Sequence, residues 1–429
     1  MKRIFLLIFT SGFLWAESLD SLIDYALKNS TLIKQTKANV ELSRLKHKES
    51  RIKQFGEIDA VGSYTHYNIE RTLAPLTPSV MKSPTPITTS KDIYSLGANY
   101  TVPLFTGFAQ TRDIQIQNIA KEMAKIKLKI TKEELIYNIR SLYLTILSLK
   151  EILKAQNSYI KALQKLNKTI AYKVKLGKKA QIDLLKSKAD LQEALANKTS
   201  LISNIKITKA TLSSLVGKTV RDIDPLSFDI SKKEYITDKL FQKIPSTSKM
   251  RVEELNLQKS DKMIQKSKAA LYPQIALNAY YGKNFGEDIH TDDWDSEEIY
   301  QIGLNAKYNL IDFGKSDINI QKAKIAKLQA KLKKEQTLLD LKKSIIKATS
   351  NIEKSYALYK NSYQRYILSK KAEDIENIRY QNNASTIDNL LLAKAKTMLA
   401  KAKLIEGKYN YQKNIYYLDY ILERGREDD

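Results

Sequence analysis

Two stretches of the chain alternate apolar and polar residues with a period of two. They are Tyr94–Gln110 and Tyr300–Ser316, and four positions match between them, 206 residues apart: Tyr94 with Tyr300, Gly97 with Gly303, Asn99 with Asn305 and Leu104 with Leu310. A period of two over nine or more residues predicts a strand with one apolar and one polar face. We expect the strands to break at Pro103 and at Asp312–Gly314, and each to lead into a long helix.

Two more alternating stretches come before these, so that the strands form pairs. One is Glu57–His66, and the other is centred on residues 275–281. Between the first pair, Arg71–Asp92 holds four of the chain's eight prolines, and between the second pair, Gly282–Glu298 is rich in Asp and Glu. Because proline removes a hydrogen bond of the ladder, we predict an exposed loop at the first place, and by analogy at the second. The four strands then form two β-hairpins.

From Phe108 to about Lys175, apolar residues recur every three, four or seven positions, and no proline or glycine intervenes. This 3.5-residue spacing predicts a coiled-coil seam, and at 1.5 Å per residue the helix is about 100 Å long. A turn at Leu176–Lys179, centred on Gly177, and a returning helix at Ile182–Leu215 complete a helical hairpin. The seam consists of Leu128, Leu135, Ile139, Leu142, Ile146, Leu149, Leu153, Ile160, Leu163, Ile170 and Val174.

The second half of the chain repeats this helical hairpin. Helices Lys315–Ile378 and Ile387–Glu423 flank a turn at Asn382–Asn383, and Asp388 matches Asp183 at an offset of 205. Shorter helices are predicted ahead of the two β-hairpins, at Ser18–Lys53 and Leu240–Ala270. The predicted fold is mainly α with a small β part: two tandem repeats of long coiled-coil hairpins plus four antiparallel strands.

The N-terminus indicates export. A basic start at Lys2–Arg3 and an apolar core at Ile4–Leu14 precede Ala16, which is typical of a cleaved signal peptide. We therefore divide the chain into a signal peptide (1–16), a first repeat (17–220), a connector (221–236), a second repeat (237–425) and a polar tail (426–429).

The composition changes this picture little. A net charge of +25 is compatible with nucleic acid, but an exported chain meets little of it, so we expect no nucleic-acid partner and assign the lysines to solvated helix faces. There is no cysteine, and the three histidines lie too far apart for a metal site. Gly217-Lys218-Thr219 lacks the earlier glycine of a phosphate loop. We expect no enzyme activity, no cofactor and no metal.

Four amphipathic strands are too few to close a barrel, because about eight are needed even for a filled interior. Their tyrosines occupy positions suited to an aromatic girdle that faces lipid headgroups. Several copies of the chain sharing one barrel fit both features. The alternative, a soluble sheet packed on the chain's own helices, would leave most of the length of these helices with nothing to pack on except other helices. The girdle tyrosines are Tyr64, Tyr94, Tyr100, Tyr281, Tyr300 and Tyr308, together with Tyr67 and Tyr280.

The order of elements, given twice after a signal peptide, resembles the TolC-like outer-membrane efflux proteins over Glu17 to about Gly425. The local motifs that carry the resemblance are Ala26-Leu27-Lys28-Asn29-Ser30, Leu271-Tyr272-Pro273-Gln274-Ile275, Val102-Pro103-Leu104-Phe105-Thr106-Gly107, Asp312-Phe313-Gly314-Lys315, Lys175-Leu176-Gly177 and Thr386-Ile387-Asp388-Asn389-Leu390. The resemblance implies a homotrimer with a 12-stranded barrel in outer-membrane lipid and a periplasmic helical tunnel. It also implies partners, namely a periplasmic adaptor (membrane fusion) protein and an inner-membrane pump.

The resemblance further implies roles for residues at the helical turns. Asp388 matches an acidic position that lines the narrow end of the tunnel, and its repeat partner Asp183 is a second candidate. The family's second acid is Leu391 here, and Ala384 or Ser385 stands where relatives carry a locking arginine. The alternative for both aspartates is helix N-capping. Candidate turn and adaptor-contact residues are Gly177, Lys178, Lys179, Asn382 and Asn383, of which Gly177 and Asn382 are predicted to adopt the left-handed conformation.

An exported coiled-coil structural protein or adhesin is the competing hypothesis. It accounts for the heptads but not for four matched strands.

Overall fold

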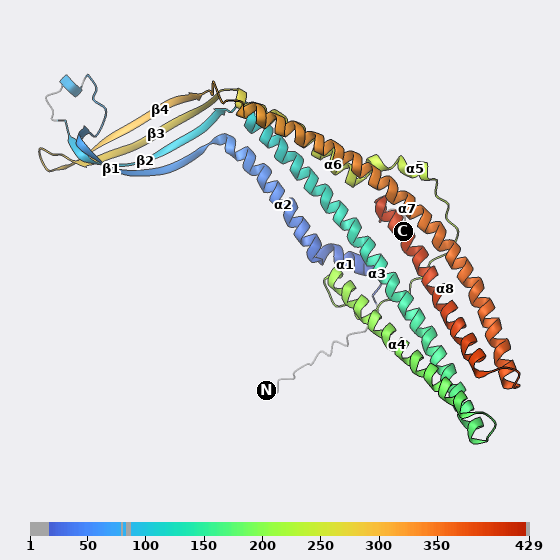
Figure 1. The fold of residues 1–429 in the computed structure, drawn as a ribbon. Helices are drawn as coiled ribbons and strands as arrows, with labels where there is room; N and C mark the ends of the chain where they lie inside the picture. The colour runs from blue at the N-terminus through green and yellow to red at the C-terminus, as the bar shows by residue number, and fades with distance from the viewer. Residues whose placement is uncertain (1–16, 79, 83–86, 426–429) are drawn as a thin grey trace, which may run out of the picture. The chain divides into compact units, whose positions relative to one another are not determined.

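The structure is a computed structural model that describes residues 17–78, 80–82 and 87–425 (Figure 1). The predicted signal peptide, the tail 426–429 and two prolines of the first predicted loop lie outside the described residues. The described chain is mainly helical with one small sheet, as the sequence predicts. It forms two compact units: residues 39–125 with 252–335, and the remaining residues. Each unit draws on both halves of the sequence.

The sheet contains four strands in the order β1-β2-β3-β4, all antiparallel to their neighbours and side by side in Figure 1. The strands are β1 (Glu57–Thr72), β2 (Thr89–Phe105), β3 (Gln274–Glu287) and β4 (Trp294–Lys307). The hairpins are joined through β2 and β3, where Gly97 lies opposite Gly282. Within the described residues, β1 and β4 therefore each have a partner on one side only.

The register gives the sheet one apolar and one polar face, as predicted. Residues directly opposite each other share a face, so the pairs of the ladder assign each paired position to one face. The apolar face includes Ile58, Leu96, Ala98, Ala279, Ile302 and Leu304. On the polar face, the Ser95 hydroxyl donates to the Asn284 side-chain oxygen at 2.7 Å, and the Thr101 hydroxyl donates to the Asn278 side-chain oxygen at 3.1 Å.

At the loop end the strands are longer, and the loops shorter, than the sequence predicts, whereas at the helix end β4 stops at Lys307, before the predicted break at Asp312–Gly314. The first loop spans residues 73–88 and contains a short 3-10 helix, η2 (Val80–Lys82), and the second spans only 288–293. For the second hairpin, the stretch from Gly282 to Glu298, rich in Asp and Glu, was predicted to be a loop. In the second hairpin, Lys283 lies directly opposite Glu298. An opposite-charge pair across two strands stabilises the ladder, so the strands continue through it.

Pro103 does not end its strand, and here the sequence prediction was wrong. β2 continues to Phe105, with a register shift between Pro103 and Phe105. The pairing of β1 with β2 begins at Glu57 and Thr101, so Pro103 is paired on the β3 side alone. A proline is tolerated where one side of a strand lacks a partner.

Four long helices form the two predicted hairpins: α3 (Ala109–Lys175), α4 (Gln181–Val216), α7 (Lys315–Gln381) and α8 (Ile387–Ile421). α3 and α7 both have 67 residues, and their starts and ends are all offset by 206. Most of the predicted α3 seam is buried, including Leu135, Ile146 and Leu163. In its middle, Ile152 and Ala155 are buried instead of Leu149 and Leu153. Among the described residues, no helix is both long enough and apolar enough to cross a membrane.

The shorter predicted helices are each interrupted. The first divides into α1 (Leu19–Asn29), α2 (Thr31–Ile52) and η1 (Lys53–Phe55), because extended Ser30 ends α1 while its carbonyl accepts the Lys34 N–H. The second is broken around Pro245, which lies at the start of a 3-10 helix. Its segments are α5 (Thr237–Phe241), η3 (Ile244–Ser246), α6 (Ser248–Ser267) and η4 (Lys268–Leu271).

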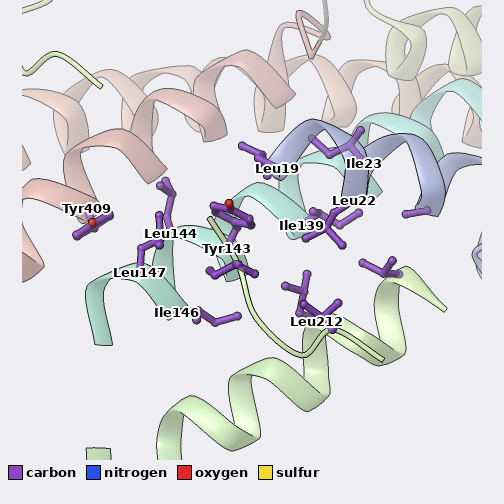
Figure 2. Packing of buried hydrophobic residues seen from close by; sticks show 14 of the residues in the cluster. Leu19, Leu22, Ile23, Ile139, Tyr143, Leu144, Ile146, Leu147, Leu212 and Tyr409 are labelled. Atoms are coloured by element: carbon purple, nitrogen blue, oxygen red, sulfur yellow. The ribbon is translucent and has the colours of Figure 1, made fainter. Parts of the chain in front are cut away.

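A buried tyrosine joins the helices to the connector. Side chains of α1, α3, α4 and α8 gather around Tyr143 of α3 (Figure 2). Its hydroxyl donates to the carbonyl of Asp224 at 2.7 Å and lies 3.1 Å from the carbonyl of Glu17, both outside the helices. Burial and the charge of Asp224 raise the pKa of Tyr143 to about 12, so this hydroxyl stays protonated at neutral pH. One side chain thus fixes both the N-terminal segment and the connector.

We expect Tyr143→Phe to lower the free energy of unfolding by about 1–3 kcal/mol, because the Asp224 carbonyl loses its donor in a buried site, whereas the Glu17 carbonyl still accepts the Asp224 N–H. Tyr172→Phe is the matched control, since Tyr172 lies on the same helix and is 64% exposed. The midpoint of thermal unfolding, followed by circular dichroism, measures both. Equal midpoints for the two variants would contradict the role given to Tyr143.

Candidate functional site

The two helical turns adopt the same left-handed conformation. Gly177 has φ 68° and Asn383 has φ 56°. After each, an N–H reaches back over the helix end, from Lys178 to the Lys173 carbonyl and from Ala384 to the Arg379 carbonyl. This pattern is the Schellman motif, which satisfies the last free carbonyls of a helix. The prediction for Gly177 is confirmed, but Asn383, rather than Asn382, takes the left-handed position.

The helices after the turns begin at equivalent positions, and neither candidate aspartate is the N-cap. Ala180 precedes α4 and Thr386 precedes α8, again 206 residues apart, and the Thr386 hydroxyl accepts the Asn389 N–H at 3.3 Å. At this offset Asn389, not Asp388, is the counterpart of Asp183, so the predicted pairing of the two aspartates is wrong. Both lie in the first turn of a helix, where the helix dipole favours a carboxylate.

Asp388 forms an ion pair with the other helical hairpin. The Lys186 ammonium of α4 lies 2.7 Å from its carboxylate, and the side chains are 43% and 60% exposed. The pair therefore links α4 to α8 close to both turns while it remains open to solvent. Lys186 was not identified from the sequence, since nothing in the pattern of α4 distinguishes it from the other lysines.

Tyr380 connects the turns beneath this ion pair. It is 3% exposed and packs in a cluster with Ile170, Leu184 and Ile387, which come from α3, α4 and α8. The Lys179 ammonium lies 4.5 Å from the centre of its ring. Burial and the charge of Asp183 raise the pKa of the Tyr380 hydroxyl. Three predicted site features, the two turns and Asp183, thus meet around one tyrosine. Leu391, where the resemblance predicts a second acid in relatives, is buried in the same cluster.

A groove of about 570 Å³ runs between α3, α4 and α8. Apolar residues form most of its lining, together with the carboxylates of Asp190 and Glu193 and the ring of Tyr159. Burial, followed by the charges of Glu193 and Asp388, raises the pKa of Asp190. The sequence analysis missed these groups, although Asp183, Asp190 and Glu193 are spaced by seven and three residues along one stripe of α4. No group of three or more acidic, His or Cys residues suited to a metal occurs in the described chain.

The candidate adaptor-contact residues are exposed at the turns, except for one. Lys178, Asn382 and Asn383 are exposed, and a side chain added at Gly177 would meet open space. Lys179 is only half-exposed because of its contact with Tyr380.

The girdle tyrosines lie at several levels of the apolar face. Tyr64 pairs with Tyr94 toward the loop end of β2, whereas Tyr281 pairs with Tyr300 in the middle of β3 and β4. Tyr100 lies toward the helix end, where its hydroxyl donates to the Phe55 carbonyl at 2.9 Å. Tyr308 directly follows β4 and is exposed.

Tyr280 does not belong to the girdle, which corrects the sequence analysis. Its place in the ladder puts it on the polar face, where its ring and hydroxyl lie over Gly97 and Gly282. Tyr67 lies outside the paired register, and the Arg71 guanidinium lies 5.5 Å from the centre of its ring.

Comparisons with known proteins agree with this arrangement. The profile of the outer membrane efflux protein family matches residues 22–218 and 246–422. No curated protein sequence matches the chain. The Campylobacter jejuni CmeC outer membrane channel is similar in structure, with a TM-score of 0.80 at 15% identity over 96% of this chain and 87% of CmeC.

Two further solved structures are similar. The Vibrio cholerae outer membrane protein VceC has a TM-score of 0.77 at 15% identity, over 94% of this chain and 95% of VceC. The open state of the Neisseria gonorrhoeae MtrE outer membrane channel has a TM-score of 0.74 at 16% identity, over 94% of this chain and 88% of MtrE.

We expect the Lys186–Asp388 ion pair to contribute little to stability. Because both side chains are well exposed, Asp388→Asn and Lys186→Gln should each change the free energy of unfolding by less than about 1 kcal/mol. Tyr380→Ala should cost about 3 kcal/mol or more, because it empties a buried site. Thermal unfolding of the three variants tests this order. A larger loss for Asp388→Asn than for Tyr380→Ala would contradict it.

Proposed function

The chain belongs to the outer membrane efflux protein family, and from this membership we propose that it is the exit channel, or channel-tunnel, of a tripartite efflux or type I secretion system. In this function an inner-membrane pump loads substrates, which then cross the periplasm and the outer membrane through the protein. The family consists of outer-membrane channels rather than enzymes, and the protein accordingly acts by conducting substrates.

The observation that carries the proposal is the incomplete sheet. Its strands have 14–17 residues, more than the 9–11 that cross a membrane. Large apolar side chains on one face point into solvent, with Ile302 76% and Leu304 70% exposed. Both edges, β1 and β4, are open within the described residues. An exposed apolar face and two open edges are unstable in water, and a closed barrel in lipid satisfies both.

Three copies of the chain supply the missing strands. Four strands from each make a 12-stranded barrel, with β1 of one copy beside β4 of the next. The apolar face then contacts outer-membrane lipid, and we assign its tyrosines to the lipid-facing aromatic girdle. The hydrogen-bonded polar face lines the lumen, which suits a water-filled channel.

The long helical hairpins of the three copies form the periplasmic tunnel. Their turns meet the periplasmic adaptor protein, and the exposed side chains there, Lys178, Asn382 and Asn383, provide contacts together with Gly177 and Lys179. Asp388 and Asp183 are assigned to the pore constriction. The carboxylates of Asp190 and Glu193 extend the acidic lining along α4.

The competing hypothesis is an exported coiled-coil structural protein or adhesin without channel activity. The seams of α3 and α7 are compatible with it. It gives no reason, however, for a four-stranded sheet with an exposed apolar face.

The function is tested by bilayer conductance, with the oligomer mass measured in the same detergent preparation. We expect a trimer and discrete, cation-preferring currents. A soluble monomer or dimer without conductance would favour the structural protein.

Two charge variants test the pore assignment in opposite directions. Asp388→Asn should reduce cation preference and block by multivalent cations, because it removes a carboxylate from the constriction. Lys186→Gln should increase both, since it removes the cation that neutralises Asp388. Reversal potentials in a salt gradient measure the change. If both variants had the same ion selectivity as the unaltered protein, the assignment of Asp388 to the pore would be wrong, while the proposed fold would stand.

A further inference from the structure

A basic pocket of about 420 Å³ lies between α2 and α3, in the same compact unit as the sheet. Its lining consists of five basic side chains and two apolar ones: Arg44, His47, Lys48, Arg51, Ile52 and Phe55 from α2 and η1, and Lys121 from α3. The α2 residues follow the spacing i, i+3, i+4, i+7 and i+8, which places them on one face of the helix. The cations are therefore concentrated by the helix rather than scattered over it.

Nearby carboxylates leave much of this charge uncompensated. Arg44 is paired, since its guanidinium donates twice to Glu41, at 2.8 and 2.5 Å. Lys121 is 3.7 Å from Glu122, whose closer partner is Lys125 at 3.0 Å. Lys48 and Arg51 have no ion-pair partner within the described ranges.

His47 lies among these cations. Its partial burial, followed by the charges of Lys121 and Arg51, lowers the pKa of its imidazole. The concentration of basic side chains around the pocket suits it to an anion.

The chain fixes this pocket beside the end of the sheet. Gly56 joins η1 to β1 with φ 74°, and a Cβ at this position would lie 2.1 Å from the Thr101 carbonyl oxygen of β2. The hydroxyl of Tyr100 holds the neighbouring Phe55 carbonyl. Because the backbone at Phe55 and Gly56 is held against β2, the basic face of α2 lies close to the helix end of the strands.

Exposed apolar side chains lie next to the cations at this junction. Phe55 is 65% exposed and Ile52 is 51% exposed. Ile58, two residues into the strand, is exposed on the apolar face of the sheet. Apolar groups on the membrane side and cations on the helix side match an amphiphile, whereas a free inorganic anion gives Phe55 and Ile52 no partner.

We propose that this pocket binds the phosphate of an anionic phospholipid headgroup, in the leaflet that the helix end of the barrel contacts. The proposal rests on the membrane-spanning sheet of the proposed function. Lys48 and Arg51 supply the unpaired cations, and Arg forms paired hydrogen bonds to phosphate. Phe55 and Ile52 contact the start of the acyl chains.

The test compares two double variants of the detergent-purified full-length protein. Lys48→Gln with Arg51→Gln removes the two unpaired pocket cations. Lys37→Gln with Lys46→Gln removes the same charge from exposed positions of α2 outside the pocket. The probes are dioctanoyl phosphatidylglycerol, dioctanoyl phosphatidylcholine and glycerol phosphate, with affinities from calorimetry in a neutral detergent.

We expect the unaltered protein to prefer phosphatidylglycerol over both other probes. The pocket variant should lose about tenfold or more of this affinity, and the control variant about twofold or less. Equal losses in the two variants would overturn the site. If glycerol phosphate bound as tightly as phosphatidylglycerol, the ligand would be a free phosphate rather than a lipid. If phosphatidylglycerol and phosphatidylcholine bound equally well, the pocket would not be selective for an anionic headgroup.

Conductance in phosphatidylcholine bilayers separates this proposal from the function on which it rests. A conducting trimer without selective lipid binding refutes the lipid site alone. Failure of the unaltered protein to form trimers or to conduct refutes the channel, and the lipid site with it. Oligomer mass and circular dichroism of each variant establish that it folds.

Discussion

The structure depends on one constraint: backbone N–H and C=O groups in a membrane must find hydrogen-bond partners within protein. Within the part of the chain that the structure describes, the sheet meets the constraint internally along β2 and β3, but β1 and β4 each offer a free edge. Within the lipid core no water is present to satisfy such an edge. The strands therefore require other strands, and further copies of the chain are the source that the proposed function assigns. The requirement for a barrel follows from it, and the exposed apolar face of the sheet suits contact with lipid.

The two long helices that follow the strands, α3 and α7, have matching positions in the two halves of the chain. α3 and α7 have the same length and begin just after strands of the same sheet, so each hairpin places its turn at the same distance along its helix. Their seams bury only part of their surface, and the buried clusters lie at particular levels. One is centred on Tyr143 and the connector, and another on Tyr380 between the turns. The buried cluster around Tyr380 packs the turns together, while the Asp388–Lys186 ion pair beside them stays exposed to solvent.

Periodicity was enough to predict the elements, their order and the duplication. The strand period and the 3.5-residue seam depend on which side of an element is apolar, and a sequence shows this directly. The ends of the strands could not be predicted as well from the sequence. Pro103 and the pair Lys283 and Glu298 marked strand ends in the sequence, but the partners across the sheet decide whether a proline or a charge is tolerated. At the turns, the offset of 205 that paired Asp183 with Asp388 followed a local match of two letters. The backbone instead keeps the offset of 206 that the strands already have. The contacts of the site, Lys186 with Asp388 and Lys179 with Tyr380, join helices about 200 residues apart and leave no trace in local spacing.

The central claim, that β1 of one copy pairs with β4 of the next, is tested most directly by disulfide cross-linking. The chain has no cysteine, so introduced pairs have no competitor. Within one sheet β1 and β4 are separated by two strands, or about 14 Å, which exceeds the Cα separation of about 7 Å that a disulfide spans. A set of variants pairs one cysteine near Ser63 of β1 with one near Gln301 of β4, positions that share the polar face. After oxidation in the membrane, the account expects a ladder of cross-linked chains that ends at three. Chains that remain single at every pair of positions would contradict it.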